Sequence, residues 1–393
     1  PGGTFEINKT SSKVYTLPAE TASMAHAALG MTTEEYMHLK FSHAISYRKM
    51  AKMSRDGVPG IPKGLKEKDI KCAVCTHANI TKNNAPGVAT GASDADCHFD
   101  MVDMSRIKTI SGMQYCTVFI MTKTRYAYCY LHKTKDEITA IMDRFLEQFD
   151  ADTKPRVMRS DCAEEYGTPA MQAILHKHGV HTHQHSNEYQ QFQNGKAEKF
   201  IDTLGRRIRA MLLNSQLPPE FWGAAVMLAT DIYNVTPHDS LNDESPFKRA
   251  KGQHPDTSFI KPFGCGMIVH RGRDLVEHSK LAPRGEKCVY LGTGNAFGRK
   301  AYIAYSPRLN RVFSTVDAQF DECYFPFRLV DQREHGHIAP QPKLEQLSLF
   351  HDIPNPTIEQ LIERINSTQV PGNDNDMRWL LSDLTKTPNT LSS

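Results

Sequence analysis

The chain has 393 residues, 39% of them hydrophobic and 23% charged, and this length excludes a single small core and predicts two or three domains. No run approaches the roughly 18 apolar residues that a membrane-spanning helix needs. Nine cysteines, an odd number in a long chain, argue against a secreted disulfide framework. We therefore expect a soluble intracellular protein.

The formal net charge of +3 is unevenly distributed. Residues 331–393 carry five Lys and Arg against nine Asp and Glu, a net charge of −4. Residues 1–330 carry 42 against 35, a net charge of +7. The sequence thus predicts a mildly basic body followed by an acidic tail.

Residues 1–77 are predicted to form a lead-in and a small helical zinc-binding domain. The pattern is helical over 32–53, with Thr32 or Thr33 as the cap. The candidate ligands are His38, His43, Cys72 and Cys75, and two nitrogen and two sulfur ligands suit tetrahedral Zn²⁺. A helix end or bend between the two histidines and a tight turn at the two cysteines would bring these side chains together. The alternative is free buried thiols beside solvated histidines, and His26 and His77 are weaker competitors as ligands.

After a linker at 78–95, a catalytic core is predicted over residues 96–240. The strands are expected at 97–102, 114–121, 126–131 and 156–160, and the helices at 135–149, 168–178, 197–214 and 220–234. This is the element order of a ribonuclease-H-like mixed sheet. The predicted fold class is therefore multidomain α+β with an α/β catalytic core.

The helix expected at 197–214 carries an apolar stripe that should face the core, formed by Ala197, Ile201, Leu204, Ile208 and Met211. Its cationic side chains lie off that stripe. These cationic side chains are Lys199, Arg206, Arg207 and Arg209. They either contact phosphate groups or form the solvated side of the helix.

Residues 241–327 are predicted to form a small β-rich, barrel-like domain. Short β-prone runs separated by turns lie at 266–270, 287–292, 301–305 and 311–317. Residues 328–393 are rich in Pro, Asn and Ser, and we predict a mostly disordered tail with one short helix at 357–365. Its acidity suggests that it binds a chromatin or transcription-machinery partner.

Three acids are candidates for a metal-dependent active site. Asp100 lies in the first strand of the core, Asp161 follows a strand, and Glu198 lies in the first turn of the long helix. A ribonuclease-H-like fold brings such positions together, and paired Mg²⁺ (or Mn²⁺) ions need carboxylate oxygens as ligands. Asp103 is the main alternative for the first acid.

Five histidines between the second and third acids could also suggest a metal cluster. They span a helix end and a strand, so we predict that they are solvated or face DNA rather than bind a metal. They are His176, His178, His181, His183 and His185.

In order and spacing, these features resemble the integrases of Ty1/copia-type LTR retrotransposons, relatives of the retroviral integrases, over about residues 30–325. The resemblance rests on the four predicted zinc ligands, on Asp100 after His98-Phe99, and on Arg159-Ser160-Asp161, Gln193-Asn194-Gly195, Ala197-Glu198, Phe221-Trp222, Phe263-Gly264-Cys265 and Phe320-Asp321-Glu322. One departure is the 36 residues between Asp161 and Glu198, one more than the family usually has.

The resemblance implies a polynucleotidyl transferase that joins the 3′ ends of double-stranded cDNA to target DNA. Its catalytic acids would be Asp100, Asp161 and Glu198, holding two Mg²⁺ (or Mn²⁺) ions, with one structural Zn²⁺ elsewhere. Predicted DNA contacts are Tyr189, Asn194, Lys199, Arg206 and Arg209.

It also implies a homo-oligomer, a tetramer or larger, assembled on two LTR ends, with no membrane partner. The expected location is the nucleus, after passage through cytoplasmic virus-like particles. Two other functions stay open. One is a domesticated DNA-binding protein without catalysis, and the other is a nuclease of the same fold that only hydrolyses.

Overall fold

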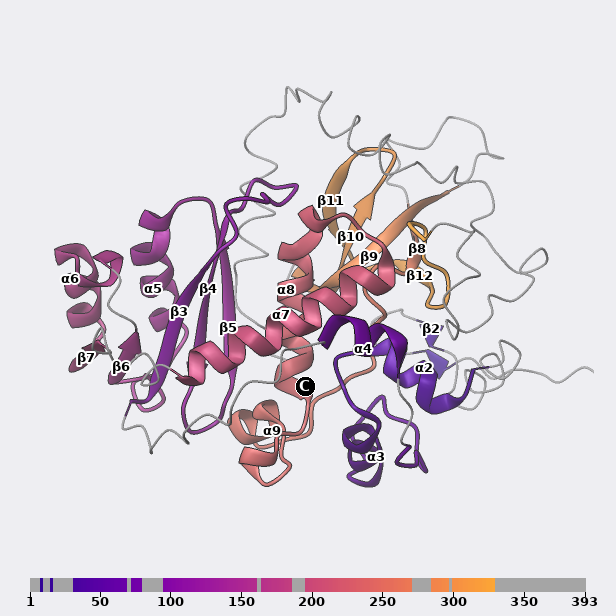
Figure 1. Ribbon diagram of the computed structural model, residues 1–393, viewed down its shortest axis with the longest axis horizontal. Coiled ribbons are helices and arrows are strands. Elements are labelled where there is room, and N and C mark those ends of the chain that lie inside the picture. The colour runs from indigo at the N-terminus through magenta and orange to yellow at the C-terminus, as the bar shows by residue number, and fades with distance from the viewer. Residues whose placement is uncertain are drawn as a thin grey trace, which may run out of the picture. The chain divides into compact units, whose positions relative to one another are not determined.

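The chain forms two compact units, described here from a computed structural model (Figure 1). Unit 1 comprises residues 1–78, 210–218 and 256–380, and unit 2 comprises 79–209, 219–255 and 381–393. The structure describes residues 8–9, 15–16, 31–68, 72–79, 95–160, 164–185, 195–270, 284–296 and 299–328. Most of the predicted linker and tail, including the helix expected at 357–365, lies outside these ranges. None of the helices in the described ranges is long and apolar enough to cross a membrane.

Unit 2 is built on a five-stranded mixed sheet. Its strands are β3 (Cys97–Asp103), β4 (Tyr115–Met121), β5 (Ala127–His132), β6 (Val157–Ser160) and β7 (Thr182–His185), in the order β5-β4-β3-β6-β7. β4 runs antiparallel to both of its neighbours, whereas β3, β6 and β7 are parallel. The four strands predicted for the core are confirmed.

One face of this sheet packs against helices α5 (Ile138–Glu147) and α6 (Pro169–Lys177) (Figure 1). Alternate residues of the strands point to this face, where Phe119 stacks on Phe145 with ring centroids 4.0 Å apart. The fully buried side chains of this core include Phe99, Phe119, Met142, Phe145, Leu146, Met158 and Met171. The helical periods predicted over 135–149 and 168–178 are confirmed.

Helix α8 (Trp222–Val235) packs on β5 through polar as well as apolar contacts. The Asn234 amide donates to the Ala127 carbonyl and accepts from its N–H, both at 2.9 Å. α9 (Pro246–Lys251) was not predicted, although its signals are clear in retrospect. The Ser245 side chain caps it, Pro246 begins it, and Gly252 ends it with a positive φ of 76°.

Helix α7 (Gly195–Ser215) extends the predicted 197–214 helix, and the predicted stripe is confirmed at Ala197, Leu204 and Met211, which are buried. Phe200 and Arg207 are also buried, whereas Ile201 and Ile208 are half-buried. The Arg207 guanidinium donates to the Ala229 carbonyl at 3.2 Å and lies over the Tyr233 ring. The interpretation of Arg207 as a solvated or DNA-facing residue is therefore wrong, because α8 supplies an acceptor and an aromatic face for it.

In unit 1, the single helix predicted over 32–53 is two helices, α2 (Thr33–Lys40) and α3 (Tyr47–Arg55). Thr32 caps α2 in a capping box with Glu35. The chain turns between the helices because Ser42 and His43 adopt positive φ values of 49° and 63°. The predicted break between the two histidines is confirmed.

The second sheet, also in unit 1, has five antiparallel strands. They are β8 (Gly266–His270), β9 (Gly285–Ala296), β10 (Arg299–Ser306), β11 (Arg311–Thr315) and β12 (Ala318–Asp321), in the order β11-β10-β9-β8-β12. All four predicted strands are confirmed, and β12 adds an edge. A separate pair, β1 (Asn8–Lys9) and β2 (Tyr15–Thr16), lies near the N-terminus of the sequence.

A largely buried polar network joins α2 to the residue that follows β12. The Tyr36 hydroxyl donates to Glu322 Oε2 at 2.6 Å, and Lys261 Nζ bonds Glu322 Oε1 at 2.5 Å. Lys40 is 8% exposed, and burial lowers its pKa to about 8 against the opposing effect of Glu322. Burial alone would raise the pKa of Glu322, but Lys261, Lys40 and Tyr36 hold it below its ordinary value of 4.5. Glu322 is thus the shared anion of this network.

Replacing Glu322 with glutamine is expected to destabilise unit 1 by about 3 to 5 kcal/mol, because it leaves a buried lysine without its anion. The free energy of opening of α2 and β12, measured by native-state hydrogen exchange at pH 7, reports the loss. Asp56→Asn is the control, since the Lys52–Asp56 pair is more exposed (3.1 Å; 27% and 34% exposed) and should contribute about 0.3 to 0.5 kcal/mol.

The effect of Glu322→Gln should also depend on pH in a defined direction. Because the folded-state pKa of Glu322 is lowered, its stabilisation is complete above the unfolded-state value of 4.5 and is lost as the pH falls through the folded-state value. The difference in opening free energy between wild type and variant should therefore shrink below about pH 4.5. If the difference in opening free energy between wild type and Glu322→Gln is the same at pH 7 and at low pH, the ionised Glu322 is not the source of the stabilisation.

Candidate functional site

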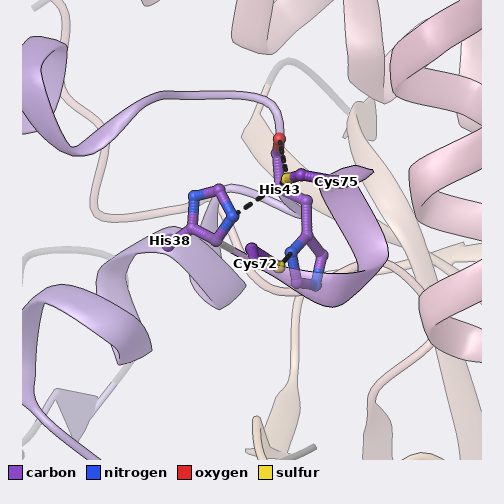
Figure 2. A group of neighbouring side chains, drawn as sticks. All are labelled: His38, His43, Cys72 and Cys75. Atoms are coloured by element: carbon purple, nitrogen blue, oxygen red, sulfur yellow. Dashed lines mark hydrogen bonds between the residues drawn. The ribbon is translucent and has the colours of Figure 1, made fainter. Parts of the chain in front are cut away.

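Four side chains of unit 1 converge on one point, as Figure 2 shows. The ligand atoms of His38, His43, Cys72 and Cys75 all lie within 4.8 Å of one another. His38 Nε2 is 3.2 Å from Cys75 Sγ, and His43 Nδ1 is 3.3 Å from Cys72 Sγ. These four residues could hold one metal ion.

Local folding brings the four residues together. His38 lies in α2, and the positive φ at His43 turns its ring toward the end of that helix. Cys72 immediately precedes helix α4 (Ala73–Asn79), and Cys75 lies in its first turn. The prediction of a tight turn at the cysteines is wrong in this respect, since they are presented by a helix start.

Hydrogen bonds select a different ring nitrogen for each histidine. His38 Nδ1 is 2.8 Å from the Ile45 carbonyl, so it carries the proton and leaves Nε2 facing the cysteines. His43 instead turns Nδ1 toward Cys72. The Tyr47 ring stacks on His38 at 5.0 Å between centroids and restrains its orientation.

The donor set and its spacing fit a zinc ion. Zn–N and Zn–S bonds of about 2.0 and 2.3 Å at tetrahedral angles separate the nitrogen from the sulfur by about 3.5 Å, close to the two N–S distances. The pKa of Cys72 lies below its ordinary value because Cys75, His38 and His43 can hydrogen-bond its thiolate, which outweighs its burial. The same contact with Cys72 raises the pKa of Cys75. A bound cation would favour both thiolates.

Of the three predicted catalytic acids, the structure describes two. Asp100 lies in β3 opposite Val118, half-buried, and its Oδ1 accepts the Met101 N–H at 2.8 Å. Glu198 is exposed in the first turn of α7. Asp161 lies outside the described residues, one position after the end of β6.

The register between β3 and β6 is described only for residues that precede Asp100 and Asp161. β3 and β6 are parallel, with His98 opposite Arg159. Asp100 and Asp161 each come two residues later in the sequence. The alternative first acid, Asp103, is exposed at the end of β3 and accepts the Ser105 N–H at 2.8 Å.

Three cations of unit 2 that the sequence analysis did not single out act on one another. Burial lowers the pKa of Lys196, and the nearby Arg125 and Arg159 lower it further. Lys196 lies two residues before Glu198, and Arg159 lies two residues before Asp161. This closeness in sequence to the predicted acids could have identified Lys196 and Arg159. Arg125 lies in the turn between β4 and β5, and no sequence signal pointed to it.

The predicted DNA contacts fall into three groups. Tyr189 and Asn194 lie outside the described residues. Lys199 and Arg209 are exposed on α7. Arg206 is 37% exposed and forms an ion pair with Asp202 at 2.8 Å.

The prediction that the five histidines are solvated or DNA-facing is only partly confirmed. His176 and His181 are exposed, and the side chain of His185 is not among those described. The His178 side chain is 7% exposed, with Nε2 2.6 Å from Asp143 Oδ1. His183 stacks on Phe99 and lies 3.0 Å from Ser160 Oγ. The prediction is therefore wrong for His178 and His183, because neighbouring elements supply partners for their rings.

His178 forms a second cluster of potential metal ligands with Asp143 and Glu147. Lys177 Nζ already lies 2.7 Å from Asp143 and 3.6 Å from Glu147, and Lys154 Nζ is 3.3 Å from His178 Nδ1. Two ammonium groups therefore occupy the positions around this cluster that a cation would need.

Comparison with known proteins identifies the class of protein to which this chain is related. Residues 269–333, which include β9 to β12, match the family described as the retroviral polymerase SH3-like domain. Relatives of the chain include retrovirus-related Pol polyproteins from plant copia-type transposons. The predicted relationship to copia-type retrotransposons is thus confirmed.

Three relatives illustrate it. The chain is 28% identical over 226 residues, 57% of its length, to the Retrovirus-related Pol polyprotein from transposon TNT 1-94 of Nicotiana tabacum. It is 24% identical over 328 residues (81%) to that from transposon RE2, and 26% over 259 residues (64%) to that from RE1, both of Arabidopsis thaliana. The aligned parts span only 17%, 22% and 17% of these polyproteins.

Proposed function

We propose that this chain is the integrase of a copia-type retrotransposon, a polynucleotidyl transferase that inserts element cDNA into target DNA. In this reaction the 3′-hydroxyl oxygen of a cDNA end attacks a target phosphorus in line. A new phosphodiester forms, and the target's own 3′-oxygen leaves. The homology to Pol polyproteins supports a retroelement function.

The proposal is supported by the strand order of unit 2 together with the sequence positions of the three acids along its elements. The strand order β5-β4-β3-β6-β7, with only β4 antiparallel to β3, agrees with a ribonuclease-H-like interpretation. Asp100 lies in the central strand β3, and Glu198 lies in the first turn of α7. In the sequence, Asp161 comes directly after β6, the parallel neighbour of β3. Such an arrangement supports their assignment as the catalytic acids.

These acids have the hard oxygen donors that Mg²⁺ (or Mn²⁺) prefers. Asp100, Asp161 and Glu198 would hold two such ions, which when bound activate the attacking hydroxyl and stabilise the leaving oxygen. The cluster in unit 1 would hold one structural Zn²⁺ through His38 and His43 nitrogens and the sulfurs of Cys72 and Cys75.

The cations around α7 provide contacts for a polyanion. Lys199, Arg206 and Arg209 would contact DNA phosphates, as would Lys196 near Glu198. Tyr189 and Asn194, which precede α7 in the sequence, stay predicted contacts. We further propose a homo-oligomer assembled on two LTR ends, acting in the nucleus after passage through cytoplasmic virus-like particles.

One assay distinguishes the proposed activity from its rivals. The protein is incubated with Mg²⁺ and labelled duplexes that carry LTR ends, and the products are separated by size. We expect strand-transfer products longer than the duplex. Cut products alone would indicate a hydrolytic nuclease, and bound duplex without reaction would indicate a domesticated DNA-binding protein, so either result would overturn the proposal.

The acidic tail carries a separate proposal, that it directs insertion through a chromatin or transcription-machinery partner. Removing residues 331–393 should then change the distribution of insertion sites in cells. An unchanged distribution rules out this role for the tail.

A further inference from the structure

His43 has one ring nitrogen that the candidate metal site does not use. Its Nδ1 faces Cys72, as described above, so Nε2 points away from the sulfurs. The Nε2 atom is buried, and among the described residues it has no partner at hydrogen-bond distance and angle. A buried imidazole N–H without an acceptor costs about 1 to 3 kcal/mol, so the site needs an acceptor there.

Asn214, in the last turn of α7, is the side chain positioned to provide that acceptor. Asn214 and the histidine lie near each other because one segment contacts the neighbours of both. The Phe263 N–H donates to Ser42 Oγ at 2.8 Å, and a Cβ added at Gly264 would lie 2.3 Å from the Ser215 Cβ. Asn214 is 5% exposed, so little solvent competes for its amide.

Arg328 determines which end of the Asn214 amide is available. Its Nε donates to the Asn214 carbonyl at 2.5 Å, and its Nη2 donates to Asn214 Oδ1. The guanidinium also lies 3.9 Å over the Phe325 ring, which holds it in place. An amide oxygen has two lone pairs, so Oδ1 can accept from Arg328 and from His43 at the same time.

We propose that Asn214 is a positioning residue for the metal site: held by Arg328, its Oδ1 accepts the His43 Nε2–H and thereby commits Nδ1 to the metal. Second ligand-shell acceptors of this kind fix the tautomer and orientation of metal-binding histidines. The inference rests on the proposed zinc site. It extends that site to the end of α7 and to the residues after β12.

The first test uses the wild-type full chain loaded with zinc and labelled with ¹⁵N-histidine. Long-range ¹H–¹⁵N spectra identify which ring nitrogen binds the metal. We expect metal on His43 Nδ1 and a slowly exchanging proton on Nε2. Metal on Nε2 overturns the inference while leaving the zinc site intact, whereas absence of bound zinc overturns the proposed site itself.

The second test measures zinc affinity by competition with a chromophoric chelator. Asn214→Leu should weaken binding by about 10- to 100-fold, whereas Asn214→Asp, which keeps the acceptor, should stay within about threefold of wild type. Thr257→Val is the matched control. Thr257 is fully buried in the same unit and bonds the Pro59 carbonyl, so this variant should lose stability but not zinc affinity.

The comparison among variants separates positioning from general stability. Equal zinc affinity in wild type and Asn214→Leu overturns the inference, as does an equal loss in Asn214→Leu and Thr257→Val. If Asn214→Leu does not fold, the spectra of the wild type and of Asn214→Asp still test the proposal. Absence of the His43 Nε2 proton signal from either zinc-loaded protein contradicts the proposed bond.

Discussion

Replacing Glu198 with glutamine is expected to abolish strand transfer while leaving DNA binding intact. Glutamine keeps the length of the side chain but removes the charge that would hold a divalent ion in the first turn of α7. A catalytic metal contributes several kcal/mol to transition-state stabilisation, so the rate of joining should fall by about a thousandfold or more. Gel separation of labelled LTR-end duplexes reports joining, and fluorescence anisotropy reports binding.

Asp202→Asn is the matched control for Glu198→Gln. Asp202 lies one turn further along the same helix, with its side chain 63% exposed and paired with Arg206 at 2.8 Å. An exposed pair of this kind contributes at most about 1 kcal/mol, so the control should join DNA at nearly the wild-type rate. Joining by Glu198→Gln at the wild-type rate would show that Glu198 is not a catalytic acid.

Local sequence signals predicted most of the regular structure because it depends on local chemistry. The β-prone runs at 114–121 and 126–131 and the helical period at 135–149 needed no knowledge of distant residues. Arg207 shows where such reasoning fails. It lies off the apolar stripe, and only the carbonyl of Ala229 and the ring of Tyr233, both from another helix, make its burial favourable.

The candidate sites divide in the same way. The cluster of potential metal ligands could be predicted from spacing because one ion needs four ligands, here two histidines and two cysteines, and these come in a recognisable order. The role of Asn214 could not, since Asn214 lies 171 positions after His43 and its amide is held by Arg328, another 114 positions along the chain. The network of Tyr36, Lys40, Lys261 and Glu322 is equally nonlocal.

Replacing Cys75 with serine is expected to remove the metal and to unfold the segment that contains α2, α3 and α4. A serine hydroxyl does not ionise near neutral pH and cannot replace the thiolate ligand. Binding of a structural zinc supplies about 10 to 16 kcal/mol in small zinc domains, far more than this short segment gains from its own apolar core. Zinc content per chain and hydrogen exchange over residues 31–68 and 72–79 measure the two effects.

Cys323→Ser is the matched control for Cys75→Ser, because Cys323 is also in unit 1 and partly buried but lies outside the cluster. Burial raises its pKa to about 12, so it is a neutral thiol whose replacement should leave the zinc content at one per chain. A chelator should unfold the same segment in wild type and in Cys323→Ser, but should have no further effect on Cys75→Ser. If Cys75→Ser keeps its zinc and its protection from exchange, the metal is not what holds these helices together, and their stability must come from contacts such as the Glu322 network.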